Sequence, residues 1–244
     1  MVAAWLGFLD SLIAVALVLA GLVGAYFGLA VPYMAFQLFL FGLLFGVLGL
    51  IIGVVGLLLT RRPQYQAAHR RAVIASYLGA MLTALLVYLA LGANGYPAIN
   101  DITTNFDNPP EFVHAVSLPG NLGRNLTYDK AKYAERQQQG YGMLEPLKLP
   151  LDPDQAFKEV STMASEMHGW TITFEDPKTR TLEGIAITPL FHFRDDFVIQ
   201  VRPAASGSVV EMRSKSRDGV GDVGANYKRI NAFFASLSAA GVPH

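Results

Sequence analysis

Apolar residues dominate the first ninety positions of the chain and then give way to alternating patterns. Three apolar runs occupy Leu6 to Leu29, Met34 to Leu59 and Ala72 to Leu91. Each run is close to the roughly 20 residues that a helix needs to cross the hydrocarbon core of a bilayer. The pattern therefore predicts three transmembrane helices in residues 1–93, of which the first two form a tight hairpin.

The loop between the second and third runs predicts how the chain is oriented. It carries Arg61, Arg62, Arg70 and Arg71, whereas the other short loop has no basic residue. Basic residues beside a span favour the cytoplasmic side. We therefore expect an inner (cytoplasmic) membrane protein with a cytoplasmic N-terminus and a periplasmic C-terminal domain. The first run lacks the basic start of a cleaved signal peptide and is too long for one, so we expect it to remain.

Residues 94–150 differ from both flanking parts, because they are rich in Asn, Pro, Gly and Gln. A short helix is predicted from Tyr128 to Gln139. The aromatic residues of this segment argue against a free linker. We expect a connecting segment that lies extended over the domain that follows.

An α+β pattern fills residues 151–244. Asp154 is placed to cap a helix from Gln155 to His168, and Asp222 to cap a final helix from Val223 to Leu237. Four strand-like runs lie between them: Trp170 to Glu175, Thr181 to Thr188, Phe197 to Arg202 and Ser208 to Lys215. This order predicts a two-layer α+β domain, in which an antiparallel sheet is covered on one side by two helices.

Composition and charge narrow the classes of partner. With 52% hydrophobic and 16% charged residues the chain is more apolar than an ordinary soluble domain, so membrane lipid is an expected partner. Residues 1–94 carry a formal charge of +3 and the remainder −3, so neither part is a polycation and nucleic acid is not expected to bind. The chain has no cysteine, which excludes disulfides, thiolate metal ligands and thiol nucleophiles.

A glycine stripe runs along one face of the second predicted span. Its members are Gly42, Gly46, Gly49, Gly53 and Gly56, spaced alternately by four and three residues. Small residues let helix backbones approach closely. The stripe therefore either packs against the shorter series Gly21, Gly24 and Gly28 of the first span, or docks a helix of another integral membrane protein.

The stretch Val209 to Ile230 concentrates basic groups. On a strand, Arg213, Lys215 and Arg217 share one face, and they lead through Gly219 and Gly221 to a helix start that contains Asn226. Free N–H groups and the helix dipole favour an anion there, so these six residues form a candidate anion site. The alternative is a structural network, in which Asp195, Asp196 and Asp218 pair with the cations and Asp222 occupies the helix start.

Catalytic and metal-binding patterns are absent from the sequence. There is no G-x-S-x-G motif, and His114, His168 and His192 are scattered without ligand spacing. Asp195 and Asp196 are adjacent and would point to opposite faces of a strand, which suits a paired acid and base poorly. We therefore expect neither an enzyme nor a metal or other cofactor.

Three separated blocks carry a family resemblance: NDITTNFDNPPEF, EGIAITPLFHFRDDFVIQVRP and VVEMRSKSRDGVGDVGANYKRI. They resemble the domain of unknown function 1499 family, with its D-x-T segment and paired prolines, its F-x-D-D strand, and its R-S-x-S-R loop before an N-x-x-R-I helix. The resemblance covers roughly Asn100 to Leu237. It implies domain boundaries and no particular reaction.

Two hypotheses for the function follow. In the first, the chain is a non-enzymatic accessory or scaffold subunit of a larger membrane complex, including an energy-transducing one, and the glycine stripe contacts its partner. In the alternative, the periplasmic domain binds an anion or a lipid headgroup through Arg213, Lys215 and Arg217, or hydrolyses such a ligand.

Overall fold

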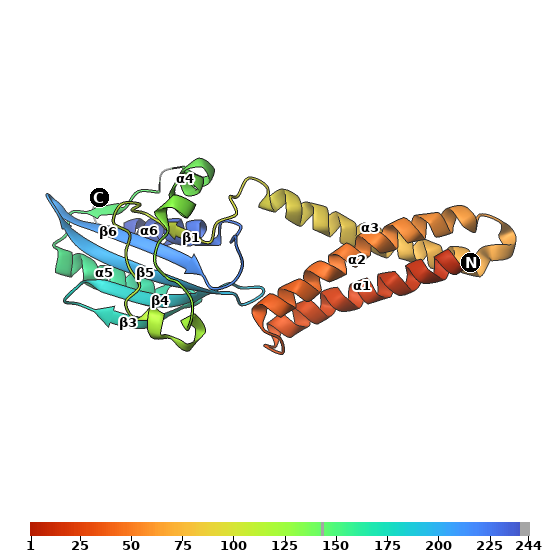
Figure 1. Ribbon diagram of the computed structural model, residues 1–244, viewed down its shortest axis with the longest axis horizontal. Coiled ribbons are helices and arrows are strands. Elements are labelled where there is room, and N and C mark those ends of the chain that lie inside the picture. Colours follow the sequence, from red (N-terminus) through yellow and green to blue (C-terminus); the bar gives the residue numbers. More distant parts are fainter. Residues whose placement is uncertain (143, 240–244) are drawn as a thin grey trace. The chain divides into compact units, whose positions relative to one another are not determined.

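The computed structural model describes residues 1–142 and 144–239, and these form two compact units (Figure 1). The helical unit comprises Met1–Asn94 with Leu190–His192, and the outer unit comprises Gly95–Pro189 with the chain from Phe193 onward. The predicted end of the domain at residue 244 lies outside the described residues. Each unit has a buried apolar cluster of its own.

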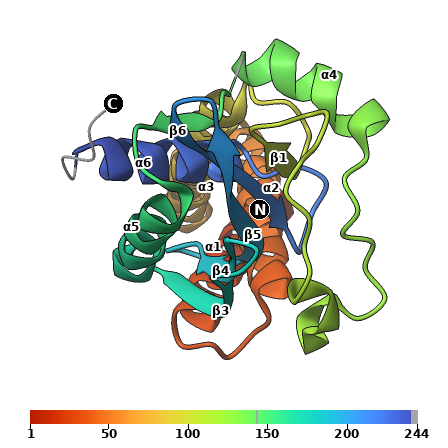
Figure 2. The ribbon, with the colours of Figure 1, turned by 90° about the vertical axis from the view of Figure 1, so that its left-hand side faces the viewer.

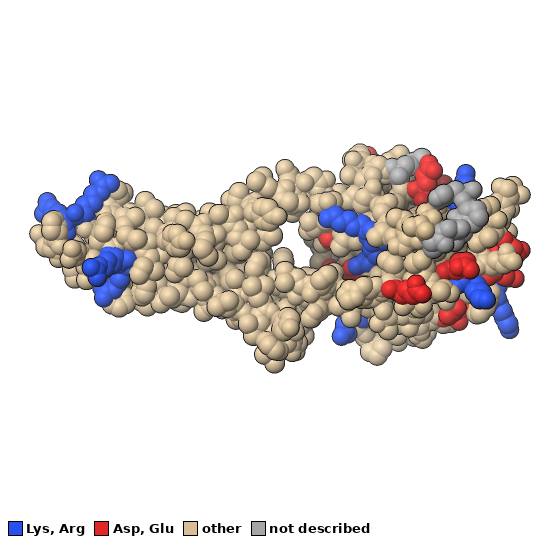
Figure 3. Space-filling model, turned by 180° about the vertical axis from the view of Figure 1, so that it is seen from behind, with Lys and Arg blue, Asp and Glu red and all other residues tan. Residues whose placement is uncertain are grey.

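The helical unit consists of α1 (Val2–Tyr26), α2 (Pro32–Leu59) and α3 (Gln66–Ala93), with a short 3-10 turn, η1 (Pro63–Tyr65), before α3. In the part of the chain that the structure describes, three helices are long and apolar enough to cross a membrane, which confirms the three predicted spans. Figure 3 shows basic side chains at one end of the helical unit and uncharged surface along the rest of its visible helices. Arg71 there lies over the ring of Trp5, at 4.0 Å from its centroid.

The glycine stripe of α2 packs inside the helical unit. All five of its glycines are buried. A Cβ added to any of these glycines would meet a neighbouring helix. The neighbour is α1 for Gly42 and Gly49, and α3 for Gly46 and Gly53. At Gly56 the Cβ would meet both helices, at Ala4 of α1 and Ala72 of α3. The hydroxyl of Ser11 also donates to the carbonyl of Ala75, at 3.2 Å. The stripe is therefore covered from both sides, by α1 and by α3.

The outer unit is built on an antiparallel sheet in the order β1-β6-β5-β4-β3, and β2 pairs with the remaining part of β6. The strands are β1 (Asp101–Thr103), β2 (Leu147–Leu149), β3 (Trp170–Asp176), β4 (Thr181–Ile187), β5 (Arg194–Ala204) and β6 (Gly207–Ser216). The last four coincide with the predicted runs, although β5 begins three residues earlier and ends two residues later than the predicted Phe197 to Arg202. The two short strands belong to the segment for which no strand was predicted, and both pair with β6.

Helices α5 (Pro153–Glu166) and α6 (Ala225–Ala239) cover one face of this sheet, as predicted (Figure 2). The core between them includes Phe157, Phe197, Met212 and Phe233. The predicted cap of α5 was wrong by two residues. Asp152 caps the helix and accepts from the backbone N–H of Asp154 at 2.9 Å, because Pro153 takes the first helical position, where a missing N–H costs nothing.

The segment between β1 and β2 covers the opposite face of the sheet (Figure 2). It contains η2 (Ala115–Ser117), η3 (Pro119–Asn121) and α4 (Lys130–Tyr141). Phe112, Ala115 and Leu126 pack there on Val198 of β5. At the β1 edge, the side chain of Gln137 accepts from the N–H of Thr103 at 3.1 Å and donates to its carbonyl at 2.7 Å.

Candidate functional site

Two cations of β6 share one carboxylate of β1. The register places Asp101 opposite Lys215 and Thr103 opposite Arg213. Nε and Nη2 of Arg213 donate to the two carboxylate oxygens of Asp101, each at 2.8 Å, and Nζ of Lys215 lies 2.7 Å from Oδ2. All three side chains are buried. The pairing of one acid with two bases requires further stabilisation of the cations.

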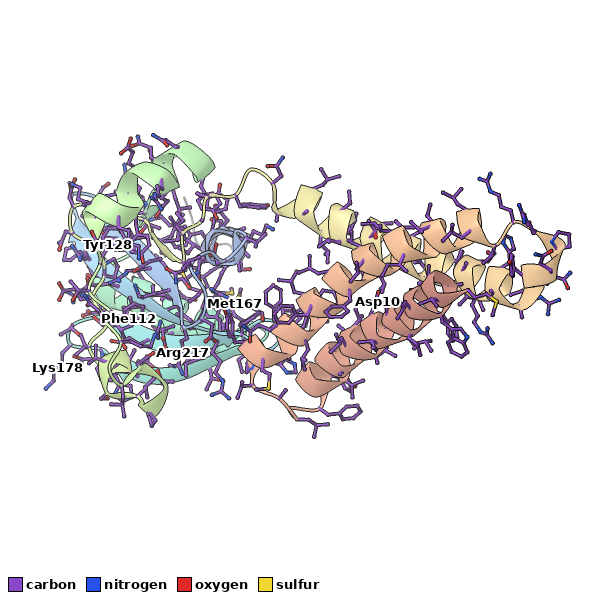
Figure 4. The ribbon with its side chains drawn as sticks, turned by 45° about the vertical axis from the view of Figure 1, so that its right-hand side comes forward. Asp10, Phe112, Tyr128, Met167, Lys178 and Arg217 are labelled. Carbon is purple, nitrogen blue, oxygen red and sulfur yellow. The ribbon has the colours of Figure 1, made fainter. Side chains whose placement is uncertain are left out.

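Aromatic rings and carbonyls provide that stabilisation. The guanidinium of Arg213 lies 5.0 Å from the ring centroid of Phe112 and 5.2 Å from that of Tyr128, both labelled in Figure 4. It also donates to the carbonyl of Leu126 at 2.7 Å. Nζ of Lys215 lies 5.4 Å from the ring of Tyr133. Burial, and next the negative charge of Asp101, raise the pKa of the Tyr128 hydroxyl, which therefore stays neutral.

The third cation of the predicted site, Arg217, pairs with Asp196 of β5. Its Nη2 lies 2.6 Å from Oδ1, and its Nε lies 3.0 Å from Oδ2. Arg124 reaches the same carboxylate at 3.2 Å and donates to the carbonyl of Ser216 at 2.8 Å. Arg213, Lys215 and Arg217, which we term the cation ladder, are thus each bound to a carboxylate of the outer unit.

The other face of β6 carries a separate polar network. Ser214 donates to Oδ1 of Asn226 at 2.7 Å, and Nδ2 of Asn226 donates to Ser216 at 2.9 Å. Arg229 donates to the Ser214 hydroxyl at 2.8 Å and pairs with Asp195 at 2.5 Å. The network fixes α6 to the sheet and engages both serine hydroxyls. Asp195 and Asp196 point to opposite faces, as expected for neighbours on a strand.

Asp222 occupies the start of α6. Its carboxylate accepts from the backbone N–H groups of Gly224, at 2.9 Å, and Asn226, at 2.8 Å, which confirms its predicted capping role. Burial raises the pKa of this carboxyl, and the two backbone hydrogen bonds partly offset the rise. Asp222 therefore fills the position in which the helix N-terminus would hold an exogenous anion.

The six residues of the predicted anion site do not surround one cavity. Asn226 lies on the helix-covered face of the sheet, and the three cations lie on the other. A hollow of about 280 Å³ touches the cation network, and of the six only Arg213 lines it, together with Arg124, Glu111 and five other residues. Within the described residues no group of three or more His, Cys, Asp or Glu side chains is placed to hold a metal ion.

Two buried acidic residues, each with several hydrogen-bond partners, were not predicted as site residues. Asp101 is the partner of two cations, and in the sequence it stands out only as part of the D-x-T segment of the family resemblance. Glu183 of β4 is fully buried, and its carboxylate accepts from the backbone N–H groups of Val113 (2.5 Å), His114 (3.0 Å) and Ala115 (2.6 Å). The available signal was an acid within an otherwise apolar strand pattern.

Glu183 fixes a surface that we term the platform, residues 112–123. Its two 3-10 turns are linked by Asn121, which donates to the carbonyl of Ala115 at 2.8 Å. The ring of His114 stacks on Phe174 with centroids 5.5 Å apart. Val113, Val116 and Leu122 project from the platform with exposed fractions of 63%, 49% and 71%. A firmly held backbone therefore presents three apolar side chains to the surroundings.

Comparison with known proteins assigns the outer unit to a family. The family model described as a protein of unknown function (DUF1499) matches residues 101–237, which is more than half of the chain. The match begins at Asp101 and ends in α6, so it contains both polar networks and the platform. No match was found among curated proteins.

Proposed function

The chain belongs to the DUF1499 family of proteins of unknown function, and on that premise we propose that it is a non-enzymatic accessory subunit of a larger membrane protein complex. Three helices hold it in the membrane, and the outer unit contacts a protein partner. We further propose that the membrane is the inner membrane and that the outer unit is periplasmic. The four arginines of the loop between α2 and α3 support this orientation.

The platform is the observation that carries this proposal. Removing a carboxylate from water costs free energy unless its oxygens accept hydrogen bonds. Both oxygens of Glu183 accept from backbone N–H groups of residues 113–115. The result is a loop ordered in advance of any contact. A preordered surface binds a partner without a further loss of loop entropy, and exposed apolar side chains give such a contact its area.

The glycine stripe does not supply the partner contact, although docking of another protein was one of the two roles that its sequence suggested. Since Gly42, Gly49 and Gly53 already lie against side chains of α1 and α3, the stripe builds the helical unit. We therefore assign the main partner contact to the platform. Other integral membrane proteins remain the expected partners.

The alternative, an anion-binding or hydrolytic domain, has less support. Asp101 takes up Arg213 and Lys215, and Asp196 takes up Arg217. A ligand would have to displace these carboxylates from buried pairs, which is costly. The hollow beside Arg213 is also lined by Glu111, whose charge opposes an anion.

Site-specific photo-crosslinking in native membranes tests the proposal. A benzophenone side chain placed at Val116 or Leu122 should give a discrete adduct with another protein. The control is Ser206, an exposed residue in the turn between β5 and β6. Leu122→Asp should abolish the adduct formed from position 116. A strictly monomeric particle after mild solubilisation, with no adduct at either platform position, would overturn the proposal.

A further inference from the structure

The bend between β6 and α6 exposes apolar side chains at its apex. We term residues 218–224 the glycine bend. Val220 is 83% exposed and Val223 is 50% exposed. Gly219 and Gly224 adopt positive φ values of 78° and 79°, and they shape the turn that carries the two valines outward. Neither valine belongs to the apolar core of the outer unit, so only a contact outside this core could bury their side chains.

The glycine bend is tied to the residues that directly follow α3. Asn100 donates to the carbonyl of Gly219 at 2.6 Å, and the N–H of Asp222 donates to the carbonyl of Ile99 at 3.2 Å. A Cβ on Gly221 would lie 3.2 Å from Cα of Ala98, and one on Gly224 would lie 2.6 Å from the Tyr96 ring. The bend therefore moves together with residues 96–100.

Chain connectivity places that tie close to the membrane. The cap of α3 is Asn94, and Tyr96 follows two residues later. Two residues span at most about 7 Å. The polar layer on each side of the hydrocarbon core is itself roughly 5 to 7 Å deep. The short connection from α3 to Tyr96 therefore keeps the residues that hold the start of α6 within a few residues of the headgroup layer in which α3 ends.

The side chains around the bend suit that layer. Lys228 is exposed, and its Nζ lies 4.7 Å from the ring centroid of Tyr96. Tyrosine and lysine both favour the membrane interface, since each joins an apolar body to a polar end. Asp218 is exposed on the same bend and offsets the charge of Lys228, so the contact depends on apolar burial rather than on anionic lipid.

We propose that the glycine bend is a second membrane attachment of this protein, with Val220 inserted among lipid headgroups of the leaflet in which α3 ends. The contact would limit how far the outer unit swings on its short connection. It involves residues distant in sequence from the platform, so it stands or falls independently of the proposed function.

A cysteine-free chain makes the experiment direct. Val220→Cys and Ser206→Cys are each labelled with an environment-sensitive fluorophore in the full-length protein and placed in phosphatidylcholine nanodiscs. A nitroxide lipid labelled near the top of its acyl chain should quench the label at position 220 at least threefold more strongly than the label at 206. Aqueous iodide should show the reverse order.

Two results would overturn the inference. Equal quenching of the two labels, with both open to iodide, would place the bend in water. A label at 220 that is shielded from iodide and also from the nitroxide lipid would show that protein covers it. Val220→Cys alters an exposed side chain, and an unchanged urea midpoint of the outer unit would verify that the labelled chain is folded.

Discussion

Asp101 on β1 and Arg213 on β6 form a bidentate ion pair in which both hydrogen bonds are 2.8 Å long and both side chains are buried. The pair joins a strand of only three residues to the longer strand beside it. It also sets the charge balance of the sheet face, because Lys215 depends on the same carboxylate. Asp101 therefore stabilises the β1 edge and both neighbouring cations.

Asp101→Asn should destabilise the outer unit strongly. The amide cannot neutralise the two buried cations, and removing one partner of a buried ion pair typically costs about 3–5 kcal/mol. Urea unfolding in micelles, followed by the fluorescence of Trp170, measures the change. Trp170 packs on Phe197 with centroids 4.1 Å apart, so its emission reports the core. A Trp5→Phe background removes the signal of the helical unit.

The control for this experiment is Asp107→Asn. Asp107 pairs with Lys130 at 2.6 Å, but both side chains are exposed, and exposed pairs contribute little to stability. The urea midpoint of this variant should match that of the parent chain. Equal effects of the two substitutions would show that the buried pair is not a principal stabilising contact of the β1 edge.

Local patterns predicted much of this fold. Apolar runs of membrane length predicted α1, α2 and α3, and alternation predicted β3 to β6, because both depend on the period of the side chains along one element. The strands β1 and β2 have three residues each, too few to show alternation. Their strand conformation comes from pairing with β6, which lies more than 50 residues away in sequence.

The candidate site was less predictable, because its contacts also join residues that are distant in sequence and leave no local pattern. The sequence shows that Arg213, Lys215 and Arg217 share a face, but it does not show which acids face them. Asp195 was a candidate partner for the ladder, yet it pairs with Arg229 on the other face, while Asp101 reaches the ladder from β1. The role of Glu183 was also hidden, because its partners are backbone N–H groups, which every residue type except proline carries.

Glu183→Gln should loosen the platform. The neutral amide has one acceptor oxygen in place of two charged ones, and its NH₂ group would face a backbone donor. Hydrogen bonds to charged groups contribute about 1.5–3 kcal/mol each, so we expect faster proteolysis within residues 112–123 and a lower urea midpoint. Limited proteolysis with mass spectrometry locates the cuts.

Glu175→Gln serves as the control for Glu183→Gln, because Glu175 is an exposed acid on β3 that accepts from Ser161. Protection of the platform should be unchanged in this variant. If Glu183→Gln leaves the platform as resistant as the parent chain does, the three backbone contacts are not what orders it.

Gly79→Ala should separate α2 from α3. A Cβ at this position would lie 2.7 Å from Cα of Leu50 and 2.8 Å from the carbonyl oxygen of Gly46, and neither backbone atom can move without shifting the helix. Overpacking of this kind costs about 1–3 kcal/mol. Gly92→Ala on the same helix is the matched control, because its Cβ would meet nothing within 4 Å.

Trp5 provides the measurement for these glycine variants, because Arg71 of α3 lies over its ring. In a Trp170→Phe background, the Trp5 emission during titration with dodecyl sulfate reports loss of the α1–α3 contact. Gly79→Ala should lower the midpoint, and Gly92→Ala should leave it in place. A normal midpoint for Gly79→Ala would contradict the close approach of α2 to α3 at this glycine.

Asp222 should give the outer unit a specific dependence on pH. Burial, the main cause, raises its folded-state pKa above the ordinary value of 3.8, and the charge of Asp195 raises it further. The folded state therefore binds this proton more tightly than the unfolded state does. The resulting stabilisation is complete below the unfolded pKa and is lost as the pH rises through the folded pKa.

The comparison with Asp222→Asn isolates this titration, since asparagine also caps helices but carries no proton of this kind. Urea midpoints of both chains at pH 7 and at about pH 4.5 are required. The parent chain should gain stability relative to the variant as the pH falls. A difference that is the same at both values would mean that the environment of Asp222 does not favour its protonated form.

Val223 holds the clearest backbone strain in the glycine bend. Its φ of 50° is left-handed, a region that β-branched residues avoid, and its side chain is half exposed. Val223→Gly removes a strain of about 1–3 kcal/mol and adds unfolded-state entropy of up to about 1 kcal/mol. We therefore expect a net stabilisation of about 1 kcal/mol, measured as a higher urea midpoint of the outer unit in micelles.

Val220→Gly, three residues earlier and outside the left-handed region, should instead be neutral or slightly destabilising, because only the entropic term applies. A loss of stability in Val223→Gly equal to that in Val220→Gly would show that the bend stores no strain at Val223.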